Sequence, residues 1–126
     1  MLNTLKLALI FLALASGQAL AEGDAAKGEK LFARCVACHS IKDTSNRTGP
    51  YLKGIVGRPV ATAEGYTYSK AMLEFAKTTG VWDEKNLDSY LADPRGVVKG
   101  TKMALGPMKK AEERADIIAF LKTIAP

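Results

Sequence analysis

The chain has 126 residues, of which 48% are hydrophobic, and its 18 lysines and arginines outnumber its 13 aspartates and glutamates to give a net charge of +5. This length predicts one small domain. The positive excess is mild and no basic run is interleaved with aromatic residues, so nucleic acid is not expected as a partner.

The first 21 residues have the pattern of an export signal. Lys6 supplies a weakly positive start, the apolar run of residues 7–14 follows, and Ala19-Leu20-Ala21 matches an A-x-A cleavage site. The apolar run is too short for a membrane span. We therefore predict cleavage after Ala21, with residues 22–126 as the mature domain in the periplasm and no stable membrane insertion. An uncleaved N-terminal anchor is the alternative.

A first helix is expected after Gly23, with Asp24 as its N-cap. Small and apolar residues follow one face of this helix at helical spacing: Ala25, Gly28, Leu31, Phe32 and Cys35. Because Gly28 has no side chain, another backbone can approach it closely. We expect the last helix to cross there, with Ile117 and Phe120 as contacts.

Residues 35–39, Cys35-Val36-Ala37-Cys38-His39, contain both cysteines and the only histidine of the chain. The spacing C-x-x-C-H is the attachment signature for a covalently bound c-type haem. On a helix the positions i, i+3 and i+4 share a face, so both thiols and the imidazole would point the same way. The two thiols could then form thioethers to one haem while His39 binds the iron as proximal ligand.

Three other interpretations of this motif compete with haem. A thiol–disulfide redox pair expects a βαβ context, and the sequence shows no strand alternation. A structural zinc site needs four cysteine or histidine ligands, whereas this chain offers three in one segment. Chance would have to place the only three such residues at one useful spacing. The motif therefore favours haem.

The rest of the chain is predicted to form helices joined by irregular loops, so the fold class is all-α. Residues 41–60 form a loop broken by glycine and proline, and residues 68–76 form a short helix. Asp83 is expected to cap a further helix that Pro94 terminates. Residues 95–107 form a second loop containing glycine.

The last helix is expected over residues 109–124. Its inward positions follow i, i+3, i+4 and i+7: Ile117, Phe120, Leu121 and Ile124. Its charged positions are expected to face mainly solvent: Glu112, Glu113, Arg114 and Asp116.

With His39 as the proximal ligand, the sixth position of the iron has to be assigned. The chain has no second histidine, and methionine sulfur is the other common choice, which raises the reduction potential. Met72 lies on an apolar helix face, where methionine is usually core filler. Met103 and Met108 both lie near the second loop, and their positions alone favour neither strongly.

The chain resembles the class I cytochromes c, in particular the bacterial cytochrome c2 group related to the mitochondrial carrier. The likeness covers nearly all of residues 22–126 in order. The segments that carry it are Gly23-Asp24 with Gly28 and Phe32, Cys35 to His39, Thr48 to Leu52 with Gly57-Arg58, Gly65 to Ser69, Val81-Trp82, Asn86 to Pro94, Lys99 to Met103 and Arg114 to Lys122.

The resemblance implies a role for individual residues. Cys35 and Cys38 would attach one haem c, and His39 and Met103 would be the metal ligands. Pro50 would accept a hydrogen bond from the His39 ring and fix its tautomer. The resemblance also places residues at the haem propionates, namely Arg58, Tyr68, Trp82 and Thr101. Tyr90 would approach Met103. Alternatively, Trp82 and Tyr90 are ordinary core aromatics, and Arg58 is a solvated loop charge.

Two positions depart from the family pattern. Phe32 lies one residue closer to the first cysteine than in the mitochondrial proteins. The second loop has Val97-Val98-Lys99 before Gly100-Thr101, without the proline often found there. This loop would be less rigid, which bears on how firmly Met103 would hold the iron.

The function that the resemblance implies is that of a soluble mono-haem electron carrier, and not an enzyme. An iron with two strong protein ligands has no open position for substrate, so it passes single electrons between membrane redox complexes. A quinol–cytochrome c reductase would be the donor and a terminal oxidase or photosynthetic reaction centre the acceptor, in respiration or photosynthesis. Other classes stay open: a small peroxidase or gas-binding haem protein, and a subunit fixed in a larger respiratory assembly.

The positive charge suits brief docking on acidic partner surfaces. Five positions match those that ring the haem edge in the resembled family: Arg34, Arg95, Lys102, Lys109 and Lys110. The alternative is a set of solvated charges that serve solubility. A monomer is expected, and Lys99 or Lys102 is a candidate to displace Met103 at high pH.

Overall fold

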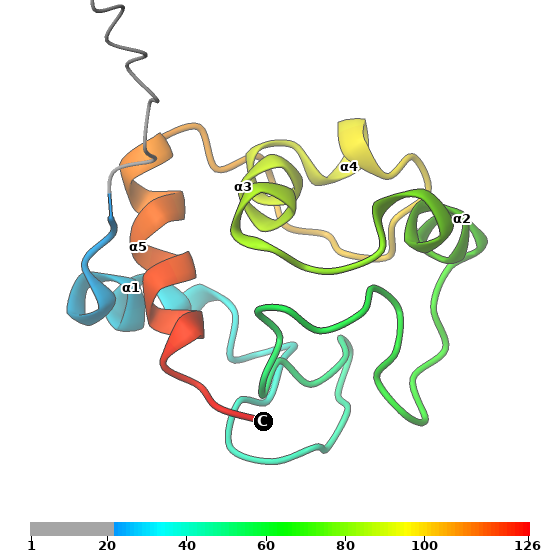
Figure 1. The fold of residues 1–126 in the computed structure, drawn as a ribbon, viewed down its shortest axis with the longest axis horizontal. Helices are drawn as coiled ribbons and strands as arrows, with labels where there is room; N and C mark the ends of the chain where they lie inside the picture. The colour runs from blue at the N-terminus through cyan, green and yellow to red at the C-terminus, as the bar shows by residue number, and fades with distance from the viewer. Residues whose placement is uncertain (1–21) are drawn as a thin grey trace, which may run out of the picture.

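A computed structural model describes residues 22–126 (Figure 1). The expected signal segment and its cleavage after Ala21 lie outside the described residues. The described part contains no strand, only an isolated bridge between Pro59 and Val81. Its helices are α1 (Ala25–Leu31), the 3₁₀ turn η1 (Phe32–Arg34), α2 (Lys70–Thr79), α3 (Glu84–Ala92), α4 (Pro94–Val97) and α5 (Ala111–Lys122).

Side-chain caps explain where three of the helices begin. Asp24 Oδ1 accepts hydrogen bonds from the backbone N–H groups of Ala26 and Lys27 at 2.9 and 3.1 Å. Asp83 Oδ1 accepts from Asn86 N–H at 2.7 Å. Both of these caps were predicted from the sequence. Ser69 caps α2, so this helix begins later than the predicted residue 68.

Helices α1 and α5 lie side by side, far apart in sequence but adjacent in space (Figure 1). A Cβ atom added to Gly28 would lie 1.9 Å from the carbonyl oxygen of Asp116 and 2.8 Å from Phe120 Cβ. The Phe32 and Phe120 rings pack beside this contact, with centroids 5.4 Å apart. The predicted crossing at Gly28 is confirmed, but the backbone of Asp116, rather than Ile117, makes the nearest approach.

The segment around Pro94 differs from the prediction of a helix end followed by loop. Helix α3 already ends at Ala92, and Pro94 begins the short helix α4. Proline suits the first helical position, because its missing N–H would have no partner there. Asp93 caps this turn by accepting a hydrogen bond from Gly96 N–H at 3.0 Å.

The prediction that Arg114 and Asp116 face mainly solvent is wrong. Arg114 has a side chain that is only 12% exposed and donates to Asp88 on α3. Asp116 accepts a hydrogen bond from the backbone N–H of Asp24 at 2.7 Å. Helix α5 is flanked by α1 and α3, so charged positions beside its apolar stripe are covered by these neighbours.

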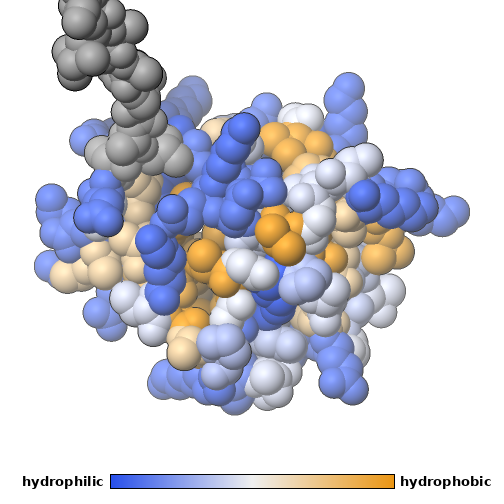
Figure 2. All heavy atoms as spheres, in the orientation of Figure 1, coloured by the Kyte–Doolittle hydropathy of each residue, from blue (hydrophilic) through white to orange (hydrophobic). Residues whose placement is uncertain are grey.

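The core unites residues from loops and helices around an aromatic group. The Trp82 ring packs against Tyr90 and Phe75, with centroids 5.2 and 5.8 Å away. Figure 2 shows hydrophobic side chains in the middle of one face, among hydrophilic side chains that project around its edge. Within residues 22–126, no helix is long and apolar enough to cross a membrane.

Candidate functional site

A cavity of about 280 Å³ lies between the cysteine motif, both loops and the inner faces of α2, α3 and α5. All of the residues to which the resemblance assigns a role at the haem line this cavity. The wall is mostly apolar, with side chains such as Phe32, Leu52, Ile55, Leu87 and Leu121. A large, mostly apolar pocket with few polar groups is typical of a cofactor site.

The cysteine motif reaches the cavity from a turn rather than from a helix. Helix α1 ends at Leu31 and η1 at Arg34, so the expectation that the motif is helical is not met. One helical turn nevertheless remains, because His39 N–H donates to the Cys35 carbonyl at 3.0 Å. Cys35, Cys38 and His39 therefore all line the same cavity.

The structure disfavours the competing interpretations of the motif. Cys35 and Cys38 are both unpaired, and burial raises the pKa of the Cys35 thiol above its ordinary value. Thiol–disulfide exchange needs the thiolate, which a raised pKa disfavours. In the part of the chain that is described, no three Cys, His, Asp or Glu side chains are grouped to hold a metal ion such as zinc.

His39 is held in one orientation by the loop that follows the motif. Its Nδ1 lies 2.6 Å from the carbonyl oxygen of Pro50, which can only accept, so Nδ1 carries the proton. A Cβ atom on Gly49 would lie 2.4 Å from the imidazole Cε1, so the ring rests directly on this glycine. Burial lowers the pKa of His39, which favours the neutral imidazole. Such a ring has Nε2 available as a metal ligand.

The methionines occupy different environments. Met103 is partly buried and lines the cavity. Met108 is 4% exposed and packs in the core, outside the cavity wall. Met72 is also buried in the core but touches the cavity. Met103 therefore lines the cavity and Met108 does not, which distinguishes two candidate ligands that the sequence pattern left open.

Thr101 links Met103 to the aromatic wall. The Thr101 hydroxyl lies 2.6 Å from the Tyr90 hydroxyl and accepts a hydrogen bond from the Met103 backbone N–H at 3.3 Å. Burial raises the pKa of Tyr90, so its phenol stays protonated. This network orients the backbone that carries the Met103 side chain.

Arg58 has a buried nitrogen that lacks a partner. Its two terminal nitrogens donate to the carbonyl oxygens of Lys53 and Tyr51 at 3.1 and 2.9 Å. Its Nε is buried and has no hydrogen-bond partner within residues 22–126. Burial of an unpaired donor on a cation is costly. Arg58 is therefore not a solvated loop charge, and an anionic group in the cavity would supply the acceptor it lacks.

Tyr68 offers a second polar group to the cavity. Its hydroxyl oxygen accepts a hydrogen bond from Ala63 N–H at 3.0 Å, which leaves the hydroxyl proton to be donated. Burial raises the pKa of Tyr68 and keeps that proton in place. Haem carries two carboxylates on an apolar ring. An apolar cavity with thiols, an oriented imidazole and unused donors at Arg58 and Tyr68 fits this group.

Sequence reasoning missed part of the wall. Tyr66 lines the cavity, donates its hydroxyl proton to the Thr48 carbonyl at 3.0 Å and packs edge-on against Tyr68 at 4.8 Å. Lys102 donates to the Thr67 carbonyl at 2.5 Å and lies over the Tyr66 ring. In the sequence, Tyr66 belongs to Gly65 to Ser69, a segment that carries the family resemblance, but the resemblance assigned no role to Tyr66 itself.

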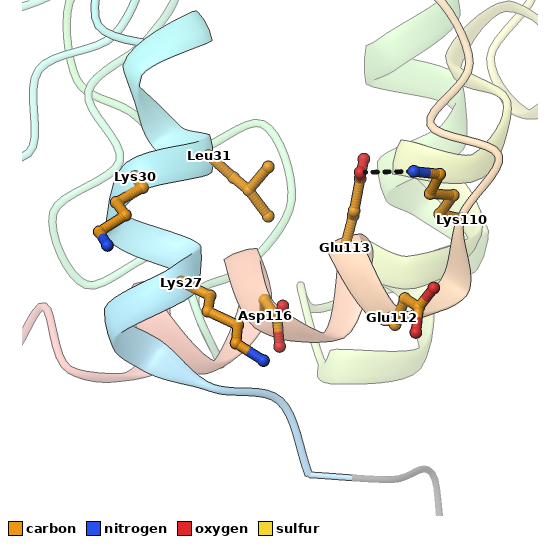
Figure 3. A pocket seen from close by; sticks show the side chains of 7 residues that line it. All are labelled: Lys27, Lys30, Leu31, Lys110, Glu112, Glu113 and Asp116. Atoms are coloured by element: carbon orange, nitrogen blue, oxygen red, sulfur yellow. Dashed lines mark ion pairs between the residues drawn. The ribbon is translucent and has the colours of Figure 1, made fainter.

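A second hollow lies between α1 and the start of α5 (Figure 3). Apart from Leu31 its lining residues are charged, and Lys110 forms an ion pair with Glu113 at 3.4 Å. It lacks the mostly apolar wall and the buried unpaired nitrogen of the cavity beside the cysteine motif. It is therefore not a candidate site for an apolar cofactor.

Comparisons with known proteins agree with this geometry. The family model described as cytochrome c matches residues 25–125. Cytochrome c2 of Rhodomicrobium vannielii is 41% identical over 125 residues, which covers 97% of each chain. Cytochrome cH from Methylobacterium extorquens has a similar solved structure, with a TM-score of 0.71, 46% identity and coverage of 80% of this chain and 99% of the other. Cytochrome c2 from Rhodospirillum centenum gives a TM-score of 0.76 at 33% identity, with 82% and 100% covered.

Proposed function

The chain belongs to the cytochrome c family, and from this premise we propose that it shuttles electrons in the periplasm with His39 and Met103 as iron ligands. The family assignment makes it a mono-haem electron carrier rather than an enzyme, with one covalently bound haem c. The observation that carries the ligand assignment is the single cavity lined by Cys35, Cys38, His39 and Met103.

Each residue of the site has a distinct task in this proposal. Cys35 and Cys38 attach the cofactor, and the hydrogen bond to Pro50 at 2.6 Å holds the His39 ring in the tautomer that binds metal. Arg58 and Tyr68 would donate hydrogen bonds to the propionates, so that these buried carboxylates would have partners. The aromatic groups of Trp82 and Tyr90 exclude water from the site.

The ligand set explains why electron transfer is the chemistry. When bound, the haem supplies a one-electron iron couple whose potential depends on its axial ligands. With His39 and Met103 both bound to the iron, no coordination position would remain for oxygen or peroxide. Since Pro50 orients His39 and Thr101 orients the backbone of Met103, the ligated site would need little rearrangement when the charge changes.

A visible spectrum in both redox states, together with an intact mass, tests this function. We expect one haem added to a chain that begins at Glu22, and a methionine–iron band in the oxidised protein. A labile or vacant sixth position would instead support a peroxidase or gas-binding protein. A mass that includes residues 1–21 would support a subunit fixed in a larger assembly. Purified protein without tetrapyrrole would contradict the function altogether.

The chain acts as a redox shuttle to partner complexes, as members of this family do. We propose a quinol–cytochrome c reductase as donor, a terminal oxidase or photosynthetic reaction centre as acceptor, and a monomeric carrier. Five cations are proposed to steer an acidic partner, and all are exposed: Arg34, Arg95, Lys102, Lys109 and Lys110. The hydrogen bond of Lys102 to Thr67 fixes this charge on the rim of the cavity.

The salt dependence of the electron-transfer rate should reveal the sign of the charge on the surface through which electrons leave. We expect electron transfer from the reduced protein to hexacyanoferrate(III) to slow by roughly tenfold as salt rises, because steering by surface charge is screened. A cationic cobalt(III) phenanthroline complex should show the opposite trend. Lys109→Glu should weaken the salt effect, whereas Lys85→Glu on α3 is the control. Equal salt responses for both oxidants would contradict the steering proposal.

A further inference from the structure

The segment that carries Met103 is held near both of its ends, whereas its middle residues, 104–106, make no backbone–backbone hydrogen bond in the described chain. We call residues 99–109 the methionine segment. Near its start, Thr101 N–H donates to the Val98 carbonyl at 3.0 Å, and near its end Met108 N–H donates to the Leu91 carbonyl at 3.0 Å. Between these anchors, none of the backbone N–H groups of residues 104–106 donates to a backbone carbonyl in the described chain, and Pro107 has no N–H to donate.

Arg114 reinforces the second anchor from helix α5. Its Nη1 donates to the carbonyl oxygens of Met108 and Lys109 at 2.7 and 3.2 Å. Its Nε donates to Asp88 Oδ1 on α3 at 2.7 Å. One guanidinium therefore joins the methionine segment to two helices, and its flat, multiple-donor geometry allows this in a way that a lysine ammonium cannot.

The ion pair of Arg114 with Asp88 is partly buried, which strengthens its hydrogen bonds. The side chains of Arg114 and Asp88 are 12% and 28% exposed. Charge-assisted hydrogen bonds are stronger than neutral ones, and screening by salt is weaker away from solvent. The carbonyls of Met108 and Lys109 would lose a charged donor if Arg114 were removed.

We infer that Arg114, oriented by Asp88, is a positioning residue that sets how firmly Met103 stays on the iron. The inference rests on the proposed ligation by Met103. The segment exchanges between a ligated form and a form with Met103 detached. Arg114 favours the ligated form, because it fixes the end of the segment to which Met103 is tethered through residues 104–107.

A second ion pair between the same two helices provides a matched control. Lys122 on α5 lies 2.6 Å from Glu84 on α3, with side chains 49% and 48% exposed. Neither residue has a hydrogen bond or ion pair with the methionine segment among the described contacts. Removing this pair tests a loss of contact between α3 and α5 alone.

Imidazole titration of the oxidised holoprotein measures the detached form. Imidazole binds only where Met103 has left, so its apparent affinity scales with the fraction of protein in that form. Arg114→Met should raise the imidazole affinity about tenfold, equivalent to about 1.4 kcal/mol. Asp88→Asn should raise it less, because the bonds to Met108 and Lys109 remain. Lys122→Met should leave it unchanged.

Other variants separate the possible failures. If Arg114→Met does not yield folded holoprotein, Arg114→Lys gives the same test with a milder loss. Imidazole affinity at the parent value in these Arg114 variants would overturn the inference. An equal rise in Lys122→Met would overturn it as well, since general loosening would then suffice. If Met103→Ala retains the methionine–iron band, the ligand assignment itself is wrong, and that failure is distinct from the failure of the Arg114 inference.

Discussion

Met103→Ala is expected to abolish the methionine–iron band of the oxidised protein and to open the iron to external ligands. The alanine side chain has no sulfur to offer. The neighbouring wall residues are apolar or hydroxyl-bearing apart from Lys102, whose ammonium group donates to the Thr67 carbonyl. In the parent protein an external ligand must compete with Met103 for the iron. Each 1.4 kcal/mol of this competition that is lost raises the affinity of the external ligand tenfold, so imidazole should bind at least about tenfold more tightly. Imidazole titration and the red region of the spectrum measure both effects.

The same variant should lower the reduction potential. Methionine as an axial ligand raises the potential, and the choice of axial ligands spans about 0.8 V in haem proteins. We expect a fall on the order of 0.1 V or more, measured by redox titration. A potential and spectrum equal to those of the parent would show that Met103 is not a ligand.

Two conservative variants serve as controls for Met103→Ala. Met72→Leu and Met108→Leu each remove a sulfur and keep about the same volume, a swap that usually costs less than about 1.5 kcal/mol in a core. Both should retain the methionine–iron band, since Met108 lies outside the cavity and Met72 packs in the core. Loss of the band in Met72→Leu would transfer the ligand role to Met72.

Gly28→Val is expected to cause the largest loss of stability. A Cβ atom at this position would lie 1.9 Å from the Asp116 carbonyl oxygen, so α1 and α5 would have to separate. Overpacking in a core costs about 1–3 kcal/mol and occasionally more, and the upper part of that range applies because the obstacle is backbone. In a domain of this size the melting temperature should fall by about 10 °C or more. Thermal unfolding of the holoprotein measures this fall.

Helix propensity would predict the opposite sign for this variant. Glycine is less favourable inside a helix than valine, so Gly28→Val would stabilise an isolated α1. Ala26→Val, at an exposed position of the same helix, reports the propensity effect alone and should cost at most about 0.7 kcal/mol. If Gly28→Val were no less stable than Ala26→Val, the close approach at Gly28 would be wrong.

Local signals in the sequence located the helices but gave only two of their starts correctly, since α2 (Lys70–Thr79) and α5 (Ala111–Lys122) differ from the predicted residues 68–76 and 109–124. The caps Asp24 and Asp83 were correctly predicted, because capping needs only a carboxylate three residues before a free N–H. Pro94 was misassigned, because proline is compatible both with the end of one helix and with the first turn of the next. The side chain of Asp93 caps α4, and this places Pro94 in the first turn of α4.

The part of the candidate site that depends on spacing could also be predicted. Cys35, Cys38 and His39 reach one cavity because a single turn suffices to align them. The unpaired Nε of Arg58 could not be predicted, since its burial depends on Lys53 and Tyr51 folding around it. Nor could the contact of Tyr66 with Thr48, which lies 18 positions away.

The sequence by itself determined the cofactor chemistry, the helical fold class and the likeness to one family, because these depend on residue types at short spacings. The tertiary structure alone decided which methionines line the cavity and which charged side chains are covered. Met103 and Met108 both lie near the second loop, yet packing of α3 and α5 directs Met108 into the core and leaves Met103 at the cavity. Arg114 joins three segments for the same reason: contacts between distant segments exist only once the helices have packed.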